Sequence, residues 1–255
     1  MIIHEKVSIM WEIIIIFFIL FLGSFIQGSS GFGFGLVSMG ILSIFLTVKD
    51  SMLIILALTV IMSLGILIKL WKYILWRDIV PILASAIVGR VLAFLFVVYF
   101  GESDFIRIWL AFVLIGMVVY LYLNRKSSDP TKHSKKRMVG LFAGGVGGFV
   151  GGVFAIGGPF FVVYFITSYQ DKRYYNANLQ LTFILLNVLT LFAHGLNGDL
   201  SYPFYFYFLI GIIVVWIGVN LGLRLFDRLS RKVIQNIAYT IILIAGINLF
   251  IVSAL

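Results

Sequence analysis

Apolar residues run along this chain in long stretches that lack any charged residue. The two longest stretches cover residues 13–48 and 138–170. Shorter charge-free runs cover 51–68, 108–124, 174–198, 200–223 and 233–255, and the run 79–101 carries a single charge, Arg90. A helix needs about 20 residues to cross the hydrocarbon core of a membrane. Each shorter run therefore predicts one membrane-spanning helix.

The two longest stretches, of 36 and 33 residues, exceed one ordinary crossing. Of the 25 glycines in the chain, 15 lie within them, where they favour a break in the helix. Broken backbone at membrane depth occurs only where it is buried in protein or lines a cavity. The pattern predicts two re-entrant or broken helical hairpins. Such interrupted segments in matching halves of a chain are typical of a transporter's substrate site.

Composition agrees with this class and excludes others. The 255 residues are 62% hydrophobic and 11% charged, whereas soluble domains carry about 25% charged residues. The net charge of +9 does not indicate nucleic acid, because the cations sit in short loops between apolar runs. The chain has no cysteine, which excludes disulfides and thiolate chemistry. The fold class predicted is an all-α polytopic membrane protein without cofactor or metal.

The chain divides into two similar halves, an N-terminal repeat over 1–124 and a C-terminal repeat over 138–255, joined by a basic linker over 125–137. The segment starting at Gly23 lies over the segment starting at Gly147 at an offset of 124, and this brings Gly33 onto Gly157. The segment Val88-Gly-Arg lies over Ile217-Gly-Val at an offset of 129. Each repeat is predicted to be a glycine-rich hairpin followed by three transmembrane helices.

Charge predicts that the two repeats are inverted. Lysine and arginine cluster at 69–77, 125–137, 172–173 and 224–232. If both glycine stretches enter and leave on one side, these clusters share a side, with fifteen basic residues against three. Positive loops mark the cytoplasmic side, so we expect a cytoplasmic linker and both termini outside. A single crossing over 13–48 would change the side of Lys6 alone, so the repeat decides in favour of the hairpin there.

The central glycines are the first candidates for binding. Their backbone N–H groups, together with the helix dipole at the start of a half-helix, form an anion site. Gly28, Gly31, Gly33, Gly157 and Gly158 are predicted to take part. Close helix packing is the alternative explanation for glycine in membranes. On the binding interpretation, flanking glycines such as Gly40 and Gly144 should tolerate alanine.

Arg90 is the sharpest single candidate, because it stands near the middle of an apolar helix. A charge at that depth costs at least about 2.5 kcal/mol, so a function or a dedicated partner must justify it. The functional hypothesis is a fixed positive charge that faces the pocket and donates paired hydrogen bonds to an oxyanion. A structural pair with a carbonyl or another helix is the alternative.

Other polar residues near the glycines complete the predicted site. We expect Gln27, Ser29 and Ser30 from the first stretch, with Gln180 and Asn187 from the segment 174–198, to bind the anion. Interhelical hydrogen bonding is the ordinary role of such residues. His194 lies close to Asp199 near the end of the same segment, and we interpret it as a satisfied interfacial histidine.

The glycine motifs resemble those of the TauE/SafE family, also called the toluene sulfonate uptake permease family. The resemblance rests on Ile26-Gln-Gly-Ser-Ser-Gly-Phe-Gly-Phe-Gly35, Gly148-Phe-Val-Gly-Gly-Val-Phe-Ala-Ile-Gly-Gly-Pro159 and Asn176-Ala-Asn-Leu-Gln-Leu-Thr-Phe183. It implies a multi-pass protein of the bacterial inner membrane that moves small sulfur anions such as sulfite, sulfonates or sulfoacetate. Gln27, Ser29 and Ser30 depart from the simpler glycine-rich motif of many members.

The sequence thus predicts a secondary transporter of a small sulfur-containing anion, more in keeping with export than import. Its expected partners are the anion, the bilayer, a coupling ion (H⁺ or Na⁺) and a second copy in a homodimer, with no nucleic acid. An anion channel is one alternative. A rhomboid-like serine protease is another, because Gly28-Ser-Ser-Gly31 matches G-x-S-G and His194 could serve as the base.

Overall fold

The computed structural model describes residues 2–101, 103–123, 133–169 and 171–225, with the single residues 240, 243, 247 and 251. The first half contains α1 (Ile2–Ser30), α2 (Phe34–Phe45), α3 (Val48–Leu70), the 3₁₀ turn η1 (Trp71–Tyr73), α4 (Trp76–Phe100) and α5 (Asp104–Leu123). The second half contains α6 (His133–Phe154), α7 (Gly158–Ser168), α8 (Lys172–Leu196) and α9 (Tyr202–Leu225). The predicted final helix over 233–255 lies almost wholly outside the described residues.

Length and composition make these helices membrane-spanning. Among the described residues, five helical segments are long and apolar enough to cross: Trp11–Ser29, Val48–Tyr73, Trp76–Phe100, Lys172–Leu196 and Tyr202–Arg224. Their outward faces remain apolar, as with Val88 and Leu92 on α4 and Ile213 and Ile217 on α9, all about half exposed. Apolar side chains on these faces are compatible with contact to lipid and not with contact to water. The prediction of an all-α polytopic membrane protein is confirmed.

Each glycine stretch forms a long helix, a short break and a half-helix. Gly31 and Gly33 adopt positive φ values of 84° and 113°, which glycine reaches without strain, and this ends α1 and starts α2. The half-helix then folds back, since a Cβ on Gly23 would lie 3.0 Å from the Phe34 ring. In the second stretch, a Cβ on Gly147 would lie 2.9 Å from Phe160. Both predicted hairpins are thus present as broken helices.

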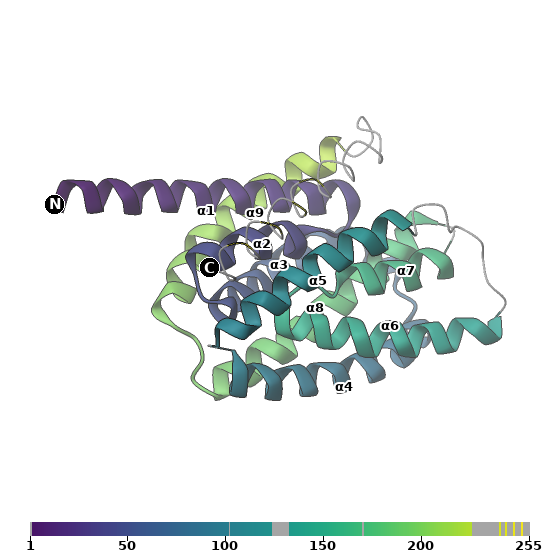
Figure 1. Cartoon of the computed structure of the whole chain (residues 1–255). Coiled ribbons are helices and arrows are strands. Elements are labelled where there is room, and N and C mark those ends of the chain that lie inside the picture. The colour runs from purple at the N-terminus through teal and green to yellow at the C-terminus, as the bar shows by residue number, and fades with distance from the viewer. Residues whose placement is uncertain are drawn as a thin grey trace.

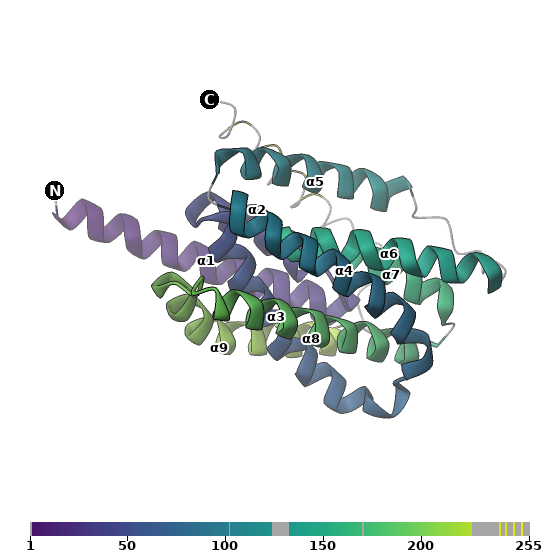
Figure 2. The same ribbon diagram turned by 90° about the horizontal axis from the view of Figure 1, so that it is seen from below.

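The two hairpins are held by matching helix pairs, α1 with α9 and α4 with α6 (Figures 1 and 2). In each pair glycine lets the backbones touch. A Cβ on Gly89 would strike the Gly145 carbonyl, and one on Gly218 would lie 2.8 Å from the Phe21 carbonyl. The repeat alignment equates these two contacts. Figure 1 also shows α1 and α6 running in opposite directions, which supports inversion; the relation of the halves to the two membrane sides stays a prediction.

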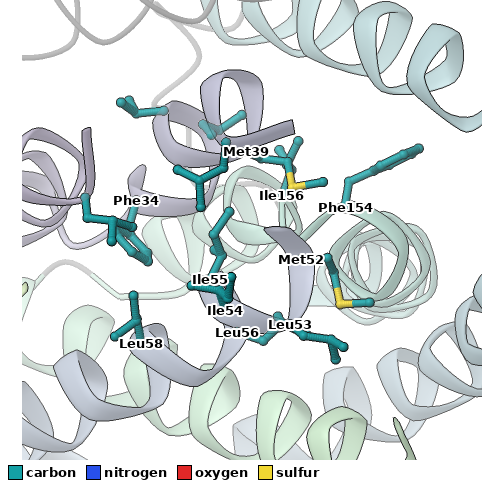
Figure 3. Close-up of a cluster of buried hydrophobic side chains, with 14 of the residues drawn as sticks. Phe34, Met39, Met52, Leu53, Ile54, Ile55, Leu56, Leu58, Phe154 and Ile156 are labelled. Atoms are coloured by element: carbon teal, nitrogen blue, oxygen red, sulfur yellow. The ribbon is translucent and has the colours of Figure 1, made fainter. Parts of the chain in front are cut away.

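A hydrophobic core lies between α2, α3 and the end of α6 (Figure 3). Phe34 and Met39 from α2 meet Met52 and Ile55 from α3, and all four are fully buried. Phe154 and Ile156 reach the same core from the second hairpin. The core therefore joins the two breaks and fixes where they meet.

The two ends of the bundle differ in charge. At one end, Arg173 donates to the Tyr73 hydroxyl at 2.9 Å, so the clusters at 69–77 and 172–173 lie together. At the other end, Lys49 pairs with Asp199 at 3.3 Å. This arrangement agrees with the predicted sidedness for the described clusters. Most of the clusters at 125–137 and 224–232 lies outside the described residues.

We expect the end that carries Tyr73 to be cytoplasmic, because basic loops stay inside. The chain has no cysteine of its own, so single cysteines report cleanly. Lys72→Cys should resist an impermeant maleimide in intact cells and react once the membrane is opened. Asn197→Cys, at the opposite end, should react in intact cells. Labelling of both, or of Lys72→Cys alone, contradicts this orientation.

Candidate functional site

The two helix breaks meet at a small cavity. It measures about 30 Å³, on a scale where one water molecule needs at least about 10–15 Å³. It is lined by Gln27, Gly33, Gly35, Leu36, Leu56, Thr59, Arg90, Ala155, Ile156, Gly157, Gly158, Pro159, Phe161, Phe183 and Asn187. The hairpins touch here, since a Cβ on Gly35 would strike the Ala155 carbonyl. The cavity therefore lies where the two hairpins meet.

The first half-helix presents its N-terminus to the cavity. Gly33 caps α2 in the left-handed conformation, and the next two cavity-lining residues are Gly35 and Leu36. The N–H groups of a helix's first turn have no partner within the helix. Of these, the N–H of Phe34 donates to Gln27 Oε1 at 3.3 Å. By this rule the N–H groups of Gly35 and Leu36 are also available to a ligand, and the dipole makes this end positive.

The second half-helix reaches the cavity in the same way but offers fewer donors. Gly157 precedes α7, and Gly158 and Pro159 begin it. Proline has no N–H group, and the N–H of Phe160 donates to the Gly157 carbonyl at 3.2 Å. Ala155, at a φ of 58°, bends the chain between α6 and α7. The predicted meeting of two hairpin N-termini at one pocket is present in the structure.

Arg90 enters the cavity from α4, and its guanidinium is fixed by neutral partners. It donates to the Gly151 carbonyl at 2.8 Å, to Asn187 Oδ1 at 2.9 Å and to Thr190 Oγ1 at 3.3 Å. The side chain is only 4% exposed, and no carboxylate is among these contacts. The structural hypothesis of carbonyl pairing is therefore correct in part, yet the positive charge itself stays without a counter-ion in these contacts.

Two buried donors on the cavity wall lack a hydrogen-bond partner within the described chain. They are Arg90 Nε and Gln27 Nε2. The amide of Gln27 is oriented by its Oε1, which accepts from the Phe34 N–H, so its nitrogen is the atom left over. Unpaired buried donors cost about 1–3 kcal/mol each. A ligand that accepts hydrogen bonds and carries negative charge would satisfy both.

Several predicted residues lie elsewhere. Gly28 packs on the Val219 carbonyl of α9, and Ser29 donates to the Ile26 carbonyl at 2.9 Å. Neither lines the cavity, and the Ser30 side chain lies outside the described residues. Gln180 also lies away from the cavity. It accepts from Ser63 at 2.7 Å and donates to the Gly31 carbonyl at 3.0 Å, so its interactions fix the helix break.

A second, larger space opens at the end of the bundle that carries the basic loops. This vestibule measures about 230 Å³ and is lined by Gly28, Gly31, Ile66, Lys69, Leu70, Lys172, Arg173, Tyr175, Asn176 and Leu223. Three of these residues, Lys69, Lys172 and Arg173, are basic, and the rest of the lining is mainly apolar. Gly31 lines the vestibule while Gly33, two residues on, lines the cavity, so the bond from Gln180 to Gly31 lies between the two spaces.

Sequence reasoning missed three polar contributors. Thr59 lines the cavity from α3, Thr190 binds Arg90, and the Gly151 carbonyl accepts from it. Thr190 had a signal, because it lies three residues after Asn187 and so shares its helix face. Thr59 and the Gly151 carbonyl had none, since neither composition nor spacing indicates which way a single threonine or a backbone carbonyl faces.

The distance between the candidate serine and His194 argues against the protease alternative. The serine of the G-x-S-G match is Ser30, which precedes the Gly31 break, and a Cβ on Gly31 would lie 3.3 Å from Asn176 Oδ1. His194 stands 18 residues further along α8, about 27 Å at the rise of a helix. A serine–histidine pair must lie within hydrogen-bond reach.

Comparison with known proteins gives one finding. The family described as "Sulfite exporter TauE/SafE" matches residues 15–249 of the chain. No curated protein and no solved structure matches the chain.

Proposed function

We propose, from the premise that this chain belongs to the TauE/SafE sulfite exporter family, that it is a secondary transporter of a small sulfur oxyanion such as sulfite or a sulfonate. One observation carries the proposal. A cavity between two half-helix N-termini is lined by Arg90 and Gln27, whose buried Nε and Nε2 donors have no hydrogen-bond partner among the described residues. That excess of donors and positive charge matches an oxyanion and no neutral or cationic solute.

The anion would be held by groups of both repeats. Arg90 Nε and Gln27 Nε2 would donate from side chains, and the N–H groups of Gly35, Leu36 and Gly158 from backbone. Asn187 would act indirectly, by orienting the guanidinium through its Oδ1. Hydrogen bonds between charged groups are about twice as strong as neutral ones, so a doubly charged or bidentate oxyanion gains most. The small volume favours a compact head group.

Alternating access is the mechanism that fits the geometry. The vestibule is lined by residues of the basic end and the cavity by both helix breaks, and Gly31, which accepts from Gln180, lines the vestibule two residues before Gly33 lines the cavity. A carrier must expose its site to one side at a time. Rocking of one hairpin against the other would break this polar contact on one side and remake an equivalent seal on the other. Export across a bacterial inner membrane, possible dimer formation and ion coupling are parts of this proposal.

The test is counterflow in proteoliposomes. Vesicles preloaded with unlabelled sulfite should transiently accumulate radiolabelled sulfite above its external concentration, because a carrier exchanges one anion for another. Sulfate, taurine, sulfoacetate and acetate added outside as competitors would then define the substrate class. A channel gives no such overshoot, so simple equilibration of the label would favour the channel alternative. Protein-free vesicles give the background.

A further inference from the structure

A buried histidine lies one helical turn from Thr190, which binds Arg90, and about two turns from Asn187, which lines the cavity. The side chain of His194 is fully buried, and its Nδ1 lies 2.6 Å from Asp199 Oδ2. Its Nε2 has no hydrogen-bond partner among the described residues. The pairing with Asp199 that the sequence predicts is present, and the position of the ring relative to the membrane interface stays a prediction. A buried titratable ring whose second nitrogen lacks a hydrogen-bond partner calls for a functional explanation.

The charges that face this ring have opposite effects. Asp199 favours the protonated imidazole, and Lys49, paired with Asp199 at 3.3 Å, opposes it. Asp50, on the same turn of α3, is engaged by Ser201. Burial raises the pKa of Asp199, but hydrogen bonds from His194 and Asn197 and the charge of Lys49 hold it below its ordinary value. Asp199 is therefore ionised throughout the physiological range, so the imidazole has a permanent anionic partner.

Contacts link the ring to Arg90. Asn187, Thr190 and His194 follow at spacings of three and four, which places them on one face of α8. Arg90 donates to the first two. Phe94, one turn beyond Arg90 on α4, meets the His194 ring edge-on at 4.9 Å between centroids. The imidazole therefore lies about one helical turn from the guanidinium, roughly 5 Å along the axis.

We propose that His194, held by Asp199, is a proton-binding site coupled to anion binding at Arg90. This rests on the proposed function and names H⁺ as its coupling ion. With the cavity empty, the Arg90 charge repels a second positive charge one turn away. A bound anion offsets that charge, so the imidazole takes up a proton more readily. Coupling between binding sites is reciprocal, and the proton in turn tightens the anion. Both would then cross in the same direction, so export would require an outward anion gradient that outweighs an inward proton gradient.

The first experiment measures the proton directly. The chain has three histidines, His4, His133 and His194, so isotope-labelled imidazoles give few NMR signals. The variants His4→Gln and His133→Gln assign the third signal by elimination, even if His194→Gln fails to fold. Methanesulfonate is the probe, because it stays ionised while histidine titrates between about pH 5 and 8. Saturating methanesulfonate should raise the His194 midpoint by about 0.7 pH units or more, the equivalent of fivefold coupling.

The second experiment measures transport. Wild-type vesicles with an acidic exterior should accumulate radiolabelled methanesulfonate, and His194→Gln should lose this accumulation while it keeps counterflow. His133→Gln, with the same chemical change, should behave as wild type.

The outcomes separate the two proposals. A protein that neither binds nor exchanges methanesulfonate or sulfite contradicts the proposed function. A protein that binds it with an unchanged His194 midpoint, or whose His194→Gln variant still follows the pH gradient, overturns the proton coupling alone. Accumulation driven by an acidic interior also overturns it, because protons would then move against the anion.

Discussion

Arg90→Lys is expected to abolish anion-induced stabilisation of the purified protein and counterflow in vesicles, while the protein still inserts and purifies. Lysine keeps the charge but has a single nitrogen. It cannot bind Gly151, Asn187 and Thr190 and also offer a donor to the cavity. We expect anion affinity to fall at least 100-fold, or by about 3 kcal/mol. Ligand-dependent thermal shifts in detergent measure this directly.

Arg90→Ala should lose binding in the same way and also lower the melting temperature of the apo protein, because the Gly151 carbonyl and two side chains lose their donor. Arg77→Lys is the matched control, since Arg77 is exposed at the basic end and should keep native behaviour. A folded Arg90→Ala protein that binds the anion with native affinity would show that Arg90 is structural only.

Gly33→Val and Gly157→Val are each expected to eliminate anion-induced stabilisation, for different physical reasons. Gly33 has a φ of 113°, where a β-branched residue is strained by about 1–3 kcal/mol. Gly157 has an ordinary φ of −68°, but a Cβ there would strike the Gly147 carbonyl and lie 3.1 Å from Gly151. Both substitutions would displace the start of a half-helix from the cavity. Melting curves with and without sulfite measure the loss.

The control glycine must be chosen from the structure. Gly144 was expected to tolerate alanine, but its Cβ would strike Ser85 and lie 2.5 Å from the Ile82 carbonyl, so that expectation is wrong. Gly145, its neighbour, has nothing within 4 Å of an added Cβ, and Gly145→Ala should keep both stability and anion binding. If Gly33→Val and Gly157→Val fold and retain the native anion-induced shift, the hairpins do not hold the anion.

Sequence predicted the positions of the helix breaks because glycine density and charge-free length are local properties. It also predicted Arg90 and Asn187 at the site, since a lone cation in an apolar helix needs polar partners. It placed Gln180 with them because seven residues separate it from Asn187 on one helix face. Seven residues also span about 10 Å along the axis, and that distance puts Gln180 at the Gly31 break, clear of the cavity.

The same limit applies to His194. Its place near the end of an apolar run predicts a position close to the membrane interface, but the sequence does not show which segments cover the ring. Here Phe94 and the loop with Asp199 cover it, and contacts between distant segments cannot be inferred from spacing. Ser29 illustrates the opposite case, because a serine in a helix readily donates to a carbonyl of the preceding turn.

The vestibule has a pharmacological consequence. Its lining is mainly apolar and includes the basic residues Lys69, Lys172 and Arg173. Such a lining suits a bulky amphiphilic anion, such as an aryl sulfonate. This anion would be too large for the cavity of about 30 Å³. Such a compound would bind in the vestibule and hold the protein in one conformation without being transported. Because the vestibule lies at the basic end, inhibition would be sided. On the orientation predicted above, the compound would act from the cytoplasm, and a membrane-impermeant version applied to intact cells would leave transport untouched.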